Sequence, residues 1–144
     1  MADILHQVGI GATPERLYTA LTDQQDVRAW WSEHSSIEPT AGSQARVSFY
    51  NDAVVFVFQV AELVPGQKVV WAIQDGPPDW LNTTITWSIS VVDGQTMIHL
   101  AHRGFASMEG NFAGVNYNWG WYITSLKFYL EKGEGMPHTD ADLP

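Results

Sequence analysis

The chain has 144 residues, of which 45% are hydrophobic, so it is long enough for one domain and too apolar for a disordered segment. A formal net charge of −9, with seven basic residues among sixteen acidic ones, argues against a protein that binds nucleic acid or an anionic membrane surface. Cysteine is absent, which excludes disulfides, thiolate metal sites and cysteine nucleophiles.

The first third of the chain predicts one strand followed by two short helices. Residues 4–10 alternate loosely and are typical of an edge strand. Thr13-Pro14-Glu15 favours a helix start, because threonine caps a helix, proline suits its first position and an acid suits its first turn. We therefore expect helices at about 14–21 and 24–31, with Trp30 and Trp31 at the end of the second.

The middle of the chain, from Ile37 to Arg103, predicts strands joined by tight turns. Residues 53–64 are almost continuously apolar and end at Pro65-Gly66, a turn signal. Asp93-Gly94 is typical of a hairpin. The strand before this hairpin carries apolar residues on one face and Thr or Ser on the other, and the return strand places Ile98, Leu100 and His102 together. One polar face per strand indicates an antiparallel sheet covered on one side.

The last element is a predicted helix over residues 113–132. Trp119, Ile123, Leu126 and Leu130 form one apolar stripe, beside a second stripe of Tyr117, Trp121, Thr124 and Phe128. A lone apolar helix must lie across the covered face of the sheet. We predict an α+β helix-grip fold, with a curved antiparallel sheet of about six to seven strands around this helix. Residues 1–133 are the expected single domain, and residues 134–144 an acidic, mobile tail.

These segments, taken in order, resemble the START-like superfamily, and within it the homologues of the activator of the heat-shock-protein-90 ATPase. The resemblance rests on Ala12-Thr13-Pro14-Glu15-x-Leu17-Tyr18-x-Ala20-Leu21-Thr22, Trp30-Trp31, Asp93-Gly94-x-Thr96, His102-x-Gly104-Phe105 and Trp119-x-x-x-Ile123-x-x-Leu126-Lys127-x-x-Leu130-Glu131-x-Gly133-x-Gly135. Asn118 departs from the glycine that relatives often carry before the tryptophan. The resemblance implies a helix-grip fold with a hydrophobic cavity between sheet and helix. Relatives include lipid and hormone binders and polyketide cyclases, so it implies no single activity.

The polar residues give little support for covalent or metal chemistry. His99 and His102 point to opposite faces of one strand and cannot share a metal, so we predict no metal and no cofactor. No Gly-x-Ser-x-Gly elbow is present, and Gly9-x-Gly11 lacks the third glycine of a dinucleotide site. His102 has two interpretations. It is either a hydrogen-bonded core histidine, or a polar anchor or general acid or base inside a pocket.

Aromatic residues carry the functional hypothesis. Seven Trp, five Tyr and six Phe exceed what a core of this size requires, and surplus aromatics often line pockets or interfaces. The predicted ligand-binding residues are Trp31, Phe56, Phe58, Trp71, Trp87, His102, Phe105, Trp119, Ile123 and Leu126. Plain core packing is the alternative for each of them taken alone.

Three functions remain open. The first is binding or carriage of a small hydrophobic or aromatic ligand in the cavity. The second is a cyclase- or dehydratase-type enzyme in which His102 moves protons. The third is a co-chaperone-like interaction module with an exposed Trp80 or Trp30 as anchor, and a homodimer is also kept open. No stretch approaches a membrane span and the start lacks a signal peptide's regions, so we expect no membrane insertion and a cytoplasmic location.

Overall fold

Seven strands form one antiparallel sheet in the computed structural model, which describes residues 1–142. Their spatial order is β1-β7-β6-β5-β4-β3-β2. The strands are β1 (Ala2–Ile10), β2 (His34–Ser36), β3 (Gln44–Phe49), β4 (Val54–Val64), β5 (Lys68–Asp75), β6 (Thr84–Val92) and β7 (Gln95–Phe105). The helices are α1 (Pro14–Thr22), α2 (Gln24–Trp30) and α3 (Phe112–Lys132), and η1 (Pro78–Trp80) is a short 3₁₀ turn.

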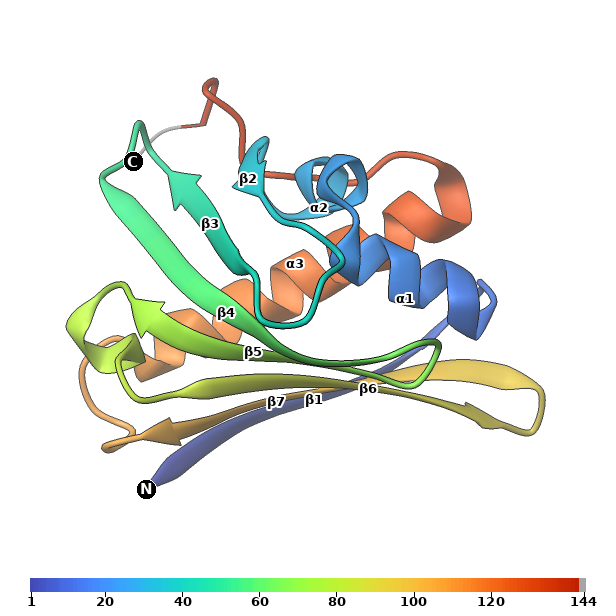
Figure 1. Ribbon diagram of the computed structural model, residues 1–144, viewed down its shortest axis with the longest axis horizontal. Coiled ribbons are helices and arrows are strands. Elements are labelled where there is room, and N and C mark those ends of the chain that lie inside the picture. The colour runs from blue at the N-terminus through green and yellow to red at the C-terminus, as the bar shows by residue number, and fades with distance from the viewer. Residues whose placement is uncertain (143–144) are drawn as a thin grey trace.

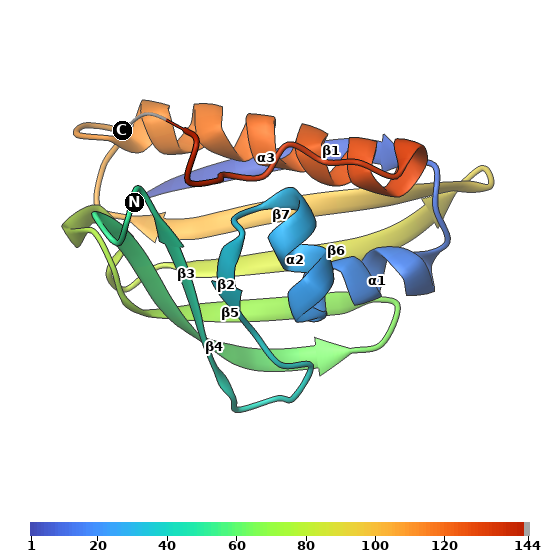
Figure 2. The ribbon, with the colours of Figure 1, turned by 90° about the horizontal axis from the view of Figure 1, so that it is seen from above.

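The helices all lie on one side of the curved sheet. Figure 1 shows the sheet bending beneath them, and Figure 2 shows α3 running lengthwise above it, close to β1. The predicted α+β helix-grip class, the two short helices after the first strand and the long final helix are therefore confirmed. The short strand β2 was not predicted, because three residues are too few to show a period of two.

Apolar periodicity explains how the two layers meet. On β6 the side chains of Ile85 and Trp87 are 0% exposed, and they alternate with polar neighbours on the outer face. On α3 the stripe that includes Trp119 and Leu126 is buried against the sheet. The helix ends at Lys132 and is capped by Gly133, whose φ of 85° lies in the left-handed region that glycine adopts without a Cβ clash. Its N–H donates to the carbonyl of Tyr129.

A polar cluster connects all three helices. The Arg16 guanidinium donates to both carboxylate oxygens of Asp26, at 2.7 and 3.0 Å, and the Tyr129 hydroxyl donates to the same carboxylate. Burial alone would raise the pKa of Asp26, but the hydrogen bonds from Arg16 and Tyr129 outweigh it and hold that pKa below its ordinary value. The cluster thus fixes α1 and α2 against the second half of α3.

The segment after α3 returns along α2 toward the β3–β4 turn, as Figure 2 shows. The Met136 N–H donates to Ser125 Oγ at 2.6 Å. The backbone of His138 bonds the carbonyl of Trp31 at 2.9 Å and the N–H of Glu33 at 3.0 Å. We expected residues 134–144 to be mobile, and the structure places 134–142 in this position. Residues 143 and 144 lie outside the described residues.

Candidate functional site

A cavity of about 270 Å³ opens at one end of the interface between α3 and the sheet. Its walls come from the first half of α3, the ends of β3 and β4 with the turn between them, η1, and the end of α2. The lining residues are Trp31, Phe49, Tyr50, Val54, Phe56, Pro77, Trp80, Asn111, Val115, Asn118, Trp119 and Tyr122. The volume is close to the lower end of the range of small-molecule sites, roughly 300–1,000 Å³.

The cavity walls are mostly aromatic, and their rings hold one another in place. Phe56 and Trp80 stack with ring centroids 3.9 Å apart. Trp31 lies 5.4 Å from Trp119 and 6.2 Å from Phe49. Because each ring is packed against another on a helix, strand or turn, the walls are largely preformed. Such walls favour a ligand with a flat or apolar body.

Besides the indoles, the polar side chains at the cavity are the amides of Asn111 and Asn118 and the hydroxyls of Tyr50 and Tyr122. Burial raises the pKa of Tyr122 to about 12, and the neighbouring Tyr50 and Asp142 add to the rise, so its hydroxyl stays protonated at neutral pH. The described lining residues include no Lys, Arg, Asp or Glu. The cavity can therefore offer hydrogen bonds to a ligand but no opposite charge.

Three of the ten predicted ligand-binding residues line this cavity, namely Trp31, Phe56 and Trp119. The other seven lie in the closed core around it: Phe58, Trp71, Trp87, His102, Phe105, Ile123 and Leu126. The two layers meet directly there, since Trp71 stacks on Trp31 with centroids 5.5 Å apart and Trp87 meets Trp119 edge-on at 5.6 Å. A ligand role for these ten residues stays a prediction, but only Trp31, Phe56 and Trp119 face the cavity.

His102 is fully buried, and both of its ring nitrogens are engaged. Its Nδ1 accepts the indole N–H of Trp119 at 3.0 Å. The Thr83 hydroxyl donates to the carbonyl of Trp80, so the Nε2–H of His102 donates to Thr83 Oγ1 at 2.9 Å. Burial lowers the pKa of His102 to about 3, which keeps the ring neutral. Of the two interpretations of His102, this geometry agrees with a hydrogen-bonded core histidine. It touches the cavity walls through Trp119, whose indole N–H it accepts, and through Trp80, whose ring centroid lies 4.6 Å from its own.

Nine lining residues were missed by sequence reasoning: Phe49, Tyr50, Val54, Pro77, Trp80, Asn111, Val115, Asn118 and Tyr122. Trp80 and Trp30, expected to be exposed anchors, are only 5% and 0% exposed, so that expectation was wrong. Trp80 lies in a loop, where no periodicity shows which way a side chain points, and it is buried by stacking on Phe56. The spacing of Val115, Trp119 and Tyr122 by four and three was the one available signal for the helical wall.

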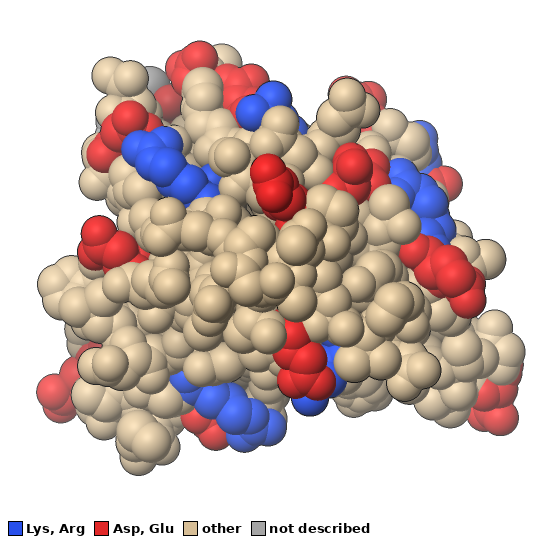
Figure 3. All heavy atoms as spheres, in the orientation of Figure 1, with Lys and Arg blue, Asp and Glu red and all other residues tan. Residues whose placement is uncertain are grey.

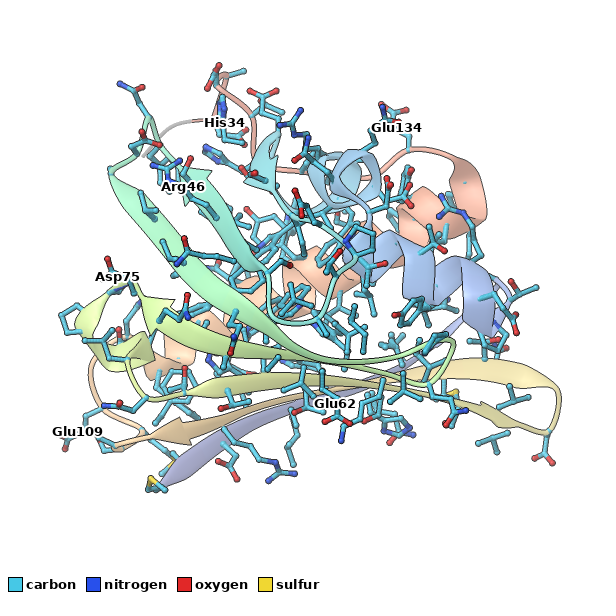
Figure 4. The ribbon with its side chains drawn as sticks, viewed as in Figure 1. His34, Arg46, Glu62, Asp75, Glu109 and Glu134 are labelled. Atoms are coloured by element: carbon cyan, nitrogen blue, oxygen red, sulfur yellow. The ribbon has the colours of Figure 1, made fainter. Side chains whose placement is uncertain are left out.

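One group of potential metal ligands lies apart from the cavity, at the edge where the C-terminal segment meets β2. The ligand-capable atoms of Glu33, His34 and Asp140 lie within 4.8 Å of one another. His34, labelled in Figure 4, donates from Nε2 to Asp140 at 2.6 Å, and that hydrogen bond raises its pKa. The three side chains are partly or fully exposed, and His34 forms ion pairs with both Glu33 and Asp140. These ion pairs explain why the three groups lie close together without a metal ion.

The charged surface carries no concentrated basic region on the face drawn in Figure 3. Blue spheres are few and lie in small groups, mostly beside red ones, while further red spheres stand alone among the uncharged side chains. Among residues 1–142, no helix combines the length and apolarity that crossing a bilayer would require. The cytoplasmic location stays a prediction.

Comparison with known proteins agrees with this architecture. Residues 11–131 match the model of the family described as activator of Hsp90 ATPase homolog 1-like protein. A search of curated proteins found no match. The solution structure of the Aha1 dimer from Colwellia psychrerythraea is 31% identical, covers 94% of this chain and 100% of its own, and has a TM-score of 0.85.

Two further solved structures share the fold at lower identity. A protein from Mesorhizobium loti is 18% identical and covers 99% of this chain and 100% of its own, with a TM-score of 0.80. A protein from Staphylococcus saprophyticus is also 18% identical, covers 96% and 98%, and has a TM-score of 0.79. With a family match over most of its length and the helix-grip fold around an aromatic cavity, the chain belongs to the activator of Hsp90 ATPase homolog 1-like family, within the START-like superfamily.

Proposed function

We propose that the protein binds or carries a small, uncharged aromatic or apolar molecule in the cavity between α3 and the sheet. The aromatic lining is the observation that carries this proposal. Trp31, Trp80 and Trp119 supply large, fixed apolar surfaces, and burying apolar area contributes about 25 cal/mol per Å². Asn111 and Asn118, at the start of α3, can accept or donate one or two hydrogen bonds and so orient the ligand.

The preference for an uncharged ligand follows from the lining. An ionised carboxylate that leaves water needs a cation or several donors as compensation, and the described lining residues supply no cation. The overall charge of −9 adds a long-range repulsion against anions. An aromatic amide or alcohol keeps the same apolar body without this cost.

The other two functions have less support. An enzyme using His102 would need a free ring nitrogen, but Trp119 and Thr83 occupy both. Tyr122 cannot act as a general base at neutral pH, because burial raises its pKa to about 12 and its hydroxyl stays protonated. A co-chaperone-like module anchored on Trp80 or Trp30 lacks its anchors, because both indoles are buried.

Self-association remains a proposal for a different surface, the outer face of α3. Tyr117 and Trp121 lie one turn apart on this face and are 70% and 47% exposed. Phe128 continues the same stripe, and Lys132 lies over its ring. Exposed tryptophan and tyrosine are typical of interface centres. The relative from Colwellia psychrerythraea is described as a dimer. We propose that a second copy of this chain covers the outer face of α3.

The binding proposal is tested with a matched pair of probes, 2-naphthamide and 2-naphthoate. Calorimetry should show the amide binding at least about tenfold more tightly than the acid, with a negative heat-capacity change. Val115→Phe should fill the cavity and abolish amide binding. Val91→Phe, the same change at a site that is 56% exposed, should leave binding intact. The proposal would be contradicted if the amide and the acid bound equally well and Val115→Phe bound the amide as tightly as the wild type.

A further inference from the structure

The turn between β3 and β4 forms one wall of the cavity and has an unusual backbone. Tyr50, Asn51 and Asp52 all have positive φ, of 53°, 53° and 65°. Asparagine and aspartate visit this left-handed region readily, but for tyrosine it carries a conformational cost. A residue held there needs neighbours that determine its position. Tyr50 lines the cavity, so whatever holds this turn also shapes the site.

The C-terminal segment contacts this turn through His138. The Tyr50 N–H donates to His138 Nε2 at 2.9 Å. The His138 ring is 2% exposed and lies 4.6 Å from the ring of Tyr50 and 5.2 Å from that of Phe49, a second cavity residue. Its other nitrogen, Nδ1, faces Asp142 at 3.3 Å. Because Nε2 accepts from the backbone, Nδ1 carries the proton in the neutral ring.

The segment is anchored on both sides of His138. Before it, Met136 bonds Ser125 Oγ, which donates in turn to the carbonyl of Trp30 at 2.8 Å. After it, Asp140 accepts from His34 and donates its N–H to Glu33 at 2.8 Å. Figure 4 shows His34 at the point where the segment reaches β2. Gly135 is required for this route, because a Cβ there would lie 2.4 Å from the carbonyl oxygen of Ala29.

We propose that His138 is a positioning residue of the ligand site, and that residues 134–142 form its outer wall by holding the Tyr50 turn against the cavity. This inference rests on the proposed ligand-binding function. By thermodynamic linkage, a ligand in the cavity stabilises the docked segment, and displacement of the segment lowers ligand affinity by the same factor. A partner that captured the C-terminal segment would therefore promote ligand release.

The positioning role is tested first without any ligand. Amide hydrogen exchange should show the Tyr50 N–H protected in the wild-type protein and about tenfold or more faster in His138→Ala. His138→Gln should restore protection, because its amide oxygen can accept the same hydrogen bond. His99→Ala, on the opposite face of the sheet, is the matched control and should change nothing at Tyr50. Equal Tyr50 protection in wild type and His138→Ala would overturn the positioning role.

The effect on the site is then measured with 2-naphthamide. We expect His138→Ala to weaken its binding about tenfold, with His138→Gln and His99→Ala close to wild type. Asp140→Ala removes only the exposed outer anchor, and should weaken binding in the same direction if His138→Ala does not fold. No binding by the wild type would refute the proposed function, while the exchange experiment would still decide the positioning role. If wild type, His138→Ala and Asp140→Ala all bound 2-naphthamide equally well, the outer-wall role of residues 134–142 would be refuted, but the proposed ligand-binding function would not.

Discussion

At the scale of single residues, His102 makes folding depend on protonation. The ring is neutral in the fold, where it accepts from Trp119, and a proton on Nδ1 would destroy that hydrogen bond. Burial lowers its pKa to about 3 in the folded protein, from the ordinary histidine value of 6.5. Between these two values the unfolded chain binds a proton that the folded protein does not. Stability from this residue is therefore complete above about pH 6.5 and falls as the pH drops toward 3.

The test compares thermal unfolding of wild type and His102→Gln between about pH 7.5 and 5, where carboxylates stay mostly ionised. Each pH unit below 6.5 should cost the wild type about 1 kcal/mol, or a few degrees in unfolding midpoint. His102→Gln should be less stable at pH 7.5, since it fits the Trp119 and Thr83 partners less well, but its midpoint should depend less on pH. Parallel pH profiles for the two proteins would show that His102 is not the titrating group.

At the scale of elements, α3 combines three different surfaces on one helix. Leu126 is 0% exposed and packs in the core, whereas Thr124 is exposed on the outer face. Lys127, between core and solvent, donates to the carbonyl of Gly9 at 2.7 Å and to Glu131 at 2.7 Å. This lysine therefore joins α3 to the end of β1. Substitution of Lys127 would therefore remove the hydrogen bond between α3 and β1, so it does not report which face of α3 is buried.

Truncation of Leu126 to alanine should cost about 2–5 kcal/mol, because it leaves a cavity in a closed core. Thr124→Ala should change stability by less than about 0.5 kcal/mol, as surface substitutions usually do. Chemical denaturation of both variants measures the difference. Similar small effects from the two changes would show that the buried face of α3 has been misidentified.

The elements were predictable from the sequence because periodicity reports which face is buried. The stripe through Trp119, Ile123 and Leu126 is buried as predicted, and the α3 boundary differs by one residue. The cavity was less predictable because it depends on where two apolar surfaces fail to meet. Trp71 and Trp87 are large aromatic residues on the inner face of their strands, as residues of a pocket wall would be. In the structure they pack directly against Trp31 and Trp119 and leave no cavity there. Loop residues such as Trp80 and Tyr50 reach the cavity through tertiary packing, which a period cannot reveal.

At the scale of the whole molecule, two groups of apolar residues carry the two proposals. One group surrounds the cavity, and the C-terminal segment contacts one of its lining residues, Tyr50, through His138. The other group, which includes Tyr117 and Trp121, lies on the outer face of α3 and is in contact with solvent. Because no residue belongs to both groups, the proposed dimer interface and the proposed ligand site share no side chain. The two properties can therefore be removed independently by mutation.

The last prediction therefore concerns assembly. Sedimentation at increasing protein concentration should show a monomer–dimer equilibrium for the wild type, since exposed Trp and Tyr are common interface anchors. The double change Tyr117→Ser and Trp121→Ser should give a monomer, with an unfolding midpoint near wild type at low concentration because both side chains are exposed. Leu5→Ser, at an apolar residue that is 61% exposed on β1, is the control and should leave the equilibrium unchanged. The double variant should still bind 2-naphthamide. A dimer that survives the double change would place the interface elsewhere on the surface, and a wild type that stays monomeric at high concentration would end the dimer proposal.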